Sequence, residues 1–208
     1  MKNNNPGLNA SAVGIAGVTR ADAPVSVRPV RRIVTGHDAQ GRSVFLSDGP
    51  TPNSFKSEYS PVVAQVAWAV DQVPVRFRPH EEPAPQGKQF KIGPERGGVI
   101  LRFVDFAPDT EYDTAQMSKF LEQVGGHEAR ADGNARHFWF HKTATLDYGI
   151  VLEGEIWAMM DVGETLMTAG DVIIQRATNH SWSNRSSKPC RMVFVLIDAM
   201  GDASAAAG

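Results

Sequence analysis

Three residues with side chains that bind metals lie in the C-terminal half of the sequence: His141, Asp147 and His180. Two histidines and one carboxylate are the ligand set of non-haem Fe(II), which keeps positions open for O2 or a substrate. The same set suits Mn, Ni or Zn. The alternative is a metal-free cluster, in which a histidine or a threonine hydroxyl hydrogen bonds to the buried carboxylate.

Strands can bring these three side chains together, because alternate residues of a strand point to the same face. His141 would share one face of a strand over 137–141 with His137 and Trp139. Asp147 and His180 would point inward from later strands. The alternative explanations are barrel filling for Trp139 and Trp182, a backbone hydrogen bond for His137 and an exposed strand end for Arg176. The residues predicted to bind substrate beside the metal are His137, Trp139, Thr143, Arg176 and Trp182.

The elements needed to position this site are short β-strands separated by glycine-containing turns, a pattern typical of an antiparallel barrel or jelly roll. One helix is predicted over 114–124, where apolar residues recur at helical spacing before Gly125 and Gly126. The predicted strands are a hairpin over 30–46, then 62–70, 98–106, 137–141, 148–153, 155–160, 165–167, 172–175, 181–184 and 191–197.

Composition excludes several classes of function. A net charge of −2 argues against nucleic-acid binding and against binding to an anionic membrane. No apolar run approaches the roughly 20 residues that cross a bilayer. Cys190 is the single cysteine, which excludes an internal disulfide and fits a cytoplasmic protein. With 208 residues and 42% hydrophobic content, one domain with extensions is expected.

The first motif around these residues resembles that of the cupin superfamily. The stretch His141-x-Thr143-x3-Asp147-x6-Gly154 has the family's spacing, with threonine in place of the second histidine and aspartate in place of glutamate. Ala135 stands where the motif usually begins with glycine. The resemblance implies ligand positions at His141 and Asp147 and none at Thr143, because a threonine hydroxyl is a poor ligand for a transition metal.

A second motif supports the same resemblance. It runs from Gly170 to His180-x3-Asn184, one residue shorter than usual and with Arg176 where proline is common. The chain therefore resembles a small single-domain cupin of the conserved-barrel type (cupin type 2). This implies an all-β jelly roll (double-stranded β-helix), a metal ligand at His180 and a homodimer. The 30–46 hairpin is our candidate for strand exchange between subunits.

We expect five regions along the chain. They are a flexible N-terminal tail over 1–29, N-terminal strands that extend the sheets over 30–106, a helix and loop insertion over 107–136, the cupin core with both motifs over 137–198, and a C-terminal tail over 199–208.

Two classes of function follow. The first is a metal-dependent enzyme, a dioxygenase or a decarboxylase, isomerase or lyase, that acts on a small aromatic or carboxylate-bearing substrate. The second is a non-catalytic small-molecule-binding cupin with a degenerate or empty metal site. The fold alone does not choose between them.

Overall fold

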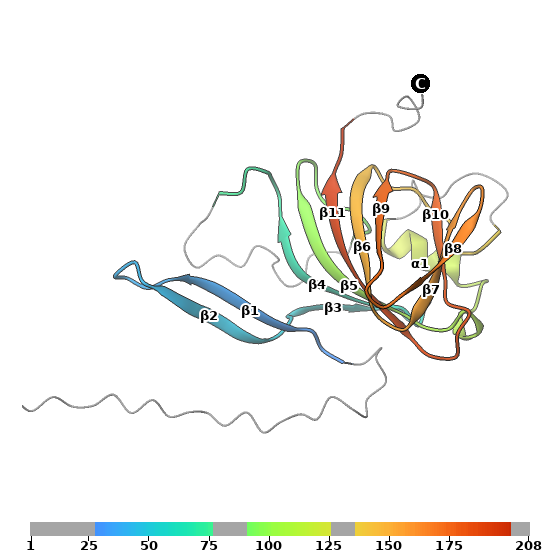
Figure 1. Cartoon of the computed structure of the whole chain (residues 1–208), viewed down its shortest axis with the longest axis horizontal. Coiled ribbons are helices and arrows are strands. Elements are labelled where there is room, and N and C mark those ends of the chain that lie inside the picture. Colours follow the sequence, from blue (N-terminus) through green and yellow to red (C-terminus); the bar gives the residue numbers. More distant parts are fainter. Residues whose placement is uncertain (1–27, 77–90, 126–135, 201–208) are drawn as a thin grey trace, which may run out of the picture.

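The computed structural model describes residues 28–76, 91–125 and 136–200, and these form an antiparallel all-β fold with one α-helix (Figure 1). The expected all-β class is therefore confirmed. The elements are β1 (Arg31–His37), β2 (Ser43–Pro50), β3 (Asn53–Lys56), β4 (Val63–Val70), β5 (Val99–Phe106), η2 (Asp109–Glu111), α1 (Met117–Gln123), β6 (Thr145–Glu153), β7 (Glu155–Met160), β8 (Glu164–Thr168), β9 (Val172–Arg176), β10 (His180–Ser183) and β11 (Cys190–Asp198).

Two sheets build the barrel. One has six strands in the order β3-β4-β5-β11-β6-β9, and the other has three in the order β10-β7-β8. Inward-facing side chains of both sheets form the hydrophobic core, to which α1 contributes Met117, Phe120 and Leu121 (Figure 1). Burial of these apolar side chains is the main favourable term in folding.

The first hairpin stands apart from the barrel. In the described ranges β1 and β2 pair only with each other and project beyond the six-stranded sheet (Figure 1). β3, β4 and β5 instead belong to the six-stranded sheet, although they precede the predicted cupin core over 137–198. β3 lies outside the strands predicted from the sequence. The predicted tails at 1–29 and 199–208 fall mostly outside the described residues.

Gly154 marks the tight connection between β6 and β7. Its φ is +80°, a conformation that other residues rarely adopt. A Cβ atom at this position would also lie 2.9 Å from the carbonyl oxygen of Pro189. The glycine of the first motif is thus required by both backbone and packing.

The strand predicted over 137–141 is wrong. This segment consists of bends and turns, and only His141 forms a β-bridge, with His180. The reason is aromatic packing: Phe138 lies 5.0 Å from Tyr112 and its neighbour Trp139 lies 5.2 Å from Phe120, between ring centroids. Two successive side chains that both pack inward are incompatible with strand alternation.

A buried ion pair joins two central strands. Arg191 of β11 donates from Nε and Nη2 to the two carboxylate oxygens of Asp105 on β5, at 2.6 and 2.7 Å. Both side chains are almost fully enclosed. Such a two-pronged geometry offsets part of the cost of removing both charges from water.

Within the described ranges, the one α-helix is far too short to cross a bilayer, and no membrane-spanning helix is found.

Candidate functional site

The barrel encloses a cavity of about 80 Å³. This is enough for several water molecules or a small organic molecule, since one water needs roughly 10–15 Å³ on the same scale. Most of its wall is apolar and aromatic, which suits a ligand with an apolar body. The polar residues in the wall are Arg102, His141, Thr143, Asp147, Gln175 and His180.

His141 and His180 are held side by side by their own backbones. Each N–H donates to the carbonyl oxygen of the other residue at 2.9 Å, and the ring centroids are 4.2 Å apart. Nδ1 of His141 donates to the Trp139 carbonyl at 2.6 Å, and Nδ1 of His180 donates to the Thr178 carbonyl at 2.9 Å. A neutral imidazole that donates through Nδ1 keeps a lone pair on Nε2.

Burial keeps both imidazoles neutral. Removal from water lowers the pKa of His141, and the nearby positive charge of Arg102 lowers it further. Burial also places the pKa of His180 well below the ordinary value, with His141 adding to the effect. Two neutral rings can accept a proton, accept a hydrogen bond or bind a metal.

Asp147 and Gln175 form a second polar group in the cavity wall. They are directly paired across β6 and β9, and their side chains are 4% and 2% exposed. Oδ1 of Asp147 and both polar atoms of the Gln175 amide have no hydrogen-bond partner within the described protein. Burial raises the pKa of Asp147 to about 6, against a hydrogen bond from Thr145 and the charge of Arg102.

Arg102 places a positive charge in the same wall. Its Nη1 and Nη2 donate to the carbonyl oxygens of Lys91 and Ile92, at 3.1 and 2.7 Å. Burial lowers the pKa of its guanidinium to about 10, and the Asp147 carboxylate opposes that shift. Arg102 therefore stays charged at neutral pH and interacts electrostatically with Asp147.

The predicted metal ligands are only partly brought together. The rings of His141 and His180 are adjacent, and each keeps an Nε2 lone pair of the kind that binds a metal. No three histidine, cysteine, aspartate or glutamate side chains in the described portion are close enough to hold a metal ion. Asp147 lines the same cavity without completing the set. As they stand, the imidazole pair fits a metal and the three-ligand set does not.

The other predicted site residues divide into two groups. Trp139, Thr143 and Trp182 line the cavity. Arg176 does not, because its side chain is exposed on the outer face of β9. Strand alternation turns its neighbour Gln175 inward instead. The cavity-facing residue of β9 is therefore Gln175 in place of Arg176.

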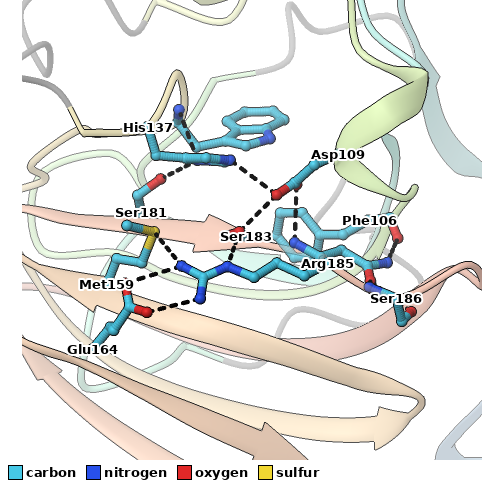
Figure 2. A network of polar contacts seen from close by, with 11 residues as sticks. Phe106, Asp109, His137, Met159, Glu164, Ser181, Ser183, Arg185 and Ser186 are labelled. Carbon is cyan, nitrogen blue, oxygen red and sulfur yellow. Dashed lines mark hydrogen bonds and ion pairs between the residues drawn. The ribbon is translucent and has the colours of Figure 1, made fainter.

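His137 also lies elsewhere than predicted. Its Nε2 donates to Asp109 at 3.2 Å and its Nδ1 accepts from the Ser181 hydroxyl at 2.7 Å (Figure 2). Ser181 follows His180 directly in β10, so His137 contacts the face of this strand opposite His180. Asp109 also accepts from the Ser183 hydroxyl, at 2.6 Å. This outer network ties η2 and the 137–141 segment to β10, and His137 is absent from the cavity wall.

Gln175 and Arg102 were missed as site residues. The available signal was a polar residue at an inward position: Gln175 follows Ile173 by two in a strand whose inner face is otherwise apolar. Arg102 likewise interrupts the apolar strand β5. A charged residue within such a strand is commonly assigned to solvent, because burial of a charge is costly.

Comparison with known proteins decides the family. The chain is 30% identical over 193 residues to the cupin-domain-containing oxidoreductase fogC of Aspergillus ruber, a match covering 88% of this chain and 75% of that protein. The chain belongs to the cupin family. Its residues 128–196 match the family model described as "Cupin domain". The expected cupin type 2 membership is therefore confirmed.

A second relative and one solved structure are also similar to this chain. The chain is 32% identical over 178 residues to the phomopsin biosynthesis cluster protein C' of Diaporthe leptostromiformis, covering 83% of this cupin and 80% of that protein. A Cupin 2 conserved barrel domain protein from Salinispora arenicola aligns in structure with a TM-score of 0.36 and 16% identity. That alignment covers 67% of this chain and 78% of the other.

Proposed function

We propose that this cupin is an enzyme that transfers protons to and from a small, largely apolar organic molecule held in the barrel cavity. The observation that carries the proposal is the Asp147 carboxyl, whose Oδ1 is buried in the cavity wall without a partner. An unsatisfied buried polar atom costs roughly 1–3 kcal/mol. Atoms kept in this state are concentrated at sites of binding and catalysis.

Different residues of the cavity wall contact different parts of the substrate in this proposal. Aromatic residues such as Trp139 and Trp182 hold the apolar body of the substrate. Asp147 removes or returns a proton, and the Nε2 lone pairs of His141 and His180 accept a hydrogen bond or proton from a substrate hydroxyl. His141, Asp147 and His180 are each less than 10% exposed, so bulk water competes little for these groups.

The similar proteins support an enzymatic role. The relative from Aspergillus ruber and another from Hypocrea virens are both named cupin-domain-containing oxidoreductases. These names support an enzymatic role. The substrate class proposed for this cupin follows from the residues of its cavity.

The exchange of hydrogen for deuterium tests the proposal with a panel of candidate substrates. The protein, kept in chelator, is incubated in D2O with small aromatic ketones, phenols and amides, and carbon-bound deuterium is followed by NMR. We expect exchange with wild type and a loss of about 10²–10⁴-fold in Asp147→Asn. Binding without exchange, or equal exchange in the variant, would leave the non-catalytic binding module as the function.

A metal-dependent oxygenase or lyase is the second candidate. The adjacent imidazoles favour it, since His141 and His180 would hold Fe, Mn, Ni or Zn while Asp147 lines the same cavity. Metal analysis after purification without chelator checks it. Near-stoichiometric metal that is lost in His180→Ala, with activity only in the metal-loaded protein, would favour this candidate over metal-free proton transfer.

We also propose that the cupin forms a homodimer through the β1–β2 hairpin. Phe45 on this hairpin is 76% exposed, and Ile33 and Leu46 are exposed as well. Large apolar side chains on an uncovered strand pair favour contact with another chain. Sedimentation of wild type as a dimer and of Phe45→Ser as a monomer is expected, and a monomeric wild type would refute the proposal.

A further inference from the structure

Asp147 and Gln175 carry buried polar atoms in the cavity wall that have no hydrogen-bond partner within the described residues. Gln175 offers an amide NH2 group with two N–H donors and one carbonyl acceptor, and Asp147 offers the acceptor Oδ1. Both side chains face the same cavity from directly paired positions on neighbouring strands. Amide and carboxylate groups this deeply buried favour a ligand that completes their hydrogen bonds.

A ligand that complements this set carries at least one acceptor beside two N–H or O–H donors. A primary carboxamide meets it: its carbonyl accepts from the Gln175 NH2, and its two N–H bonds donate to the Gln175 Oε1 and the Asp147 Oδ1. An ester or ketone has no donor and leaves two buried acceptors unpaired. A carboxylate also lacks donors, and it places a second negative charge beside Asp147.

We propose that Gln175 and Asp147 form a recognition site for a neutral carboxamide, urea or similar N–H-bearing carbonyl group attached to an apolar or aromatic body. The proposal rests on the proposed function in that it names the substrate class of the same cavity. It assigns Gln175 as a specificity-determining residue that does not itself take part in the chemistry.

The apolar part of such a ligand would face the aromatic part of the wall. Phe106, Trp182 and Phe194 stack edge-on or tilted against one another, with centroids 5.5–6.4 Å apart. They line the cavity together with aliphatic residues. Aromatic rings in these geometries provide a wall suited to another ring.

Calorimetric titration of the full chain with four probes of similar size tests the site: benzamide, methyl benzoate, benzoate and toluene, at pH 8. We expect benzamide to bind at least about 10-fold more tightly than the other three, because only benzamide pairs both acceptors. This comparison uses wild type alone, so it does not depend on whether a variant folds.

Two variants localise the effect. Gln175→Leu should bind toluene at least as well as wild type does and lose the preference for benzamide. Arg176→Gln is the matched control, because it changes the adjacent residue, whose side chain is exposed outside the cavity. Its affinities should stay within about twofold of wild type.

Other results of the titrations would contradict the recognition site or the cavity itself. Equal affinity for benzamide and methyl benzoate, or a preference that survives in Gln175→Leu, would overturn the recognition site while leaving a ligand-binding cavity. Tightest binding of benzoate would show that the charge of Arg102 governs selection, and would also overturn it. Failure of all four probes to bind, toluene included, would count against the cavity and hence against the proposed function as well.

Discussion

Two buried aspartates occupy neighbouring parts of the same six-stranded sheet and have opposite surroundings. Asp105 on β5 is fully enclosed, and both its oxygens accept from Arg191. Asp147 on β6 is 4% exposed, and its Oδ1 has no partner. Burial is the largest factor that raises the pKa of each carboxyl. Arg191 opposes this rise for Asp105 by direct contact, whereas a hydrogen bond from Thr145 and the charge of Arg102 oppose it for Asp147.

The difference separates a structural carboxylate from a functional one. A buried charge whose hydrogen bonds are complete stabilises one arrangement of strands and has no free lone pair for a ligand. A buried carboxyl with an unpaired oxygen destabilises the fold and gains from a ligand that pairs it. Stability and function should therefore respond in opposite ways when the two residues are changed.

The largest effect is expected from Asp105→Ala. It leaves the buried Arg191 guanidinium without its carboxylate, so the free energy of unfolding should fall by about 3–5 kcal/mol. Urea denaturation monitored by fluorescence measures this. The double variant Asp105→Leu with Arg191→Met should recover much of the loss. A loss below about 1 kcal/mol in the single variant would mean that the pair resembles a surface ion pair.

Asp147→Asn should instead stabilise the protein at pH 8. The folded-state pKa of about 6 lies above the unfolded value, so the wild-type carboxyl favours folding below roughly pH 4 and loses that contribution as pH rises through 6. The variant has no carboxyl to ionise, so its gain should reach about 3 kcal/mol at most above pH 7 and disappear near pH 4. Urea denaturation across this pH range checks it. A destabilised variant would indicate a bound partner for the carboxylate, such as a metal.

His137→Ala extends the comparison to the two faces of β10. The outer face is hydrogen bonded through His137 to Ser181 and Asp109 (Figure 2). On the inner face, His180 donates through Nδ1 to the Thr178 carbonyl and keeps a lone pair on Nε2. The loss of these two hydrogen bonds should lower the melting temperature and cost about 1–2 kcal/mol. An unchanged melting temperature would show that the outer network is not structural.

The smallest effect should come from Ala177→Gly. Ala177 has a φ of +49° at the end of β9, a conformation that is strained for alanine and easy for glycine. The substitution should therefore be neutral or stabilise the protein by about 0.5 kcal/mol, despite the greater flexibility of the unfolded chain. Thermal unfolding measures it. A marked loss of stability would show that the alanine methyl group contributes packing that exceeds the strain.

Alternation along β6 was sufficient to predict that Asp147 points inward and Tyr148 outward, because one face of this strand is continuously buried. Alternation failed at 137–141, where ring packing between distant segments, such as Phe120 with Trp139, determines the backbone. Local sequence does not specify which rings meet. The pairing of Asp147 with Gln175 depends on the register of β6 and β9, which is set across the sheet.

The backbone bridge between His141 and His180 makes the spacing of the two rings independent of the chain that connects them. Extra residues in the exposed turn Asp161–Gly163 would lengthen this connection without separating the histidines. A longer turn should therefore leave the distance between the two imidazoles unchanged. Evolution, or an engineer, can resize the β7–β8 hairpin or exchange the opposite cavity wall to accept new ligands while the same two imidazoles remain in place.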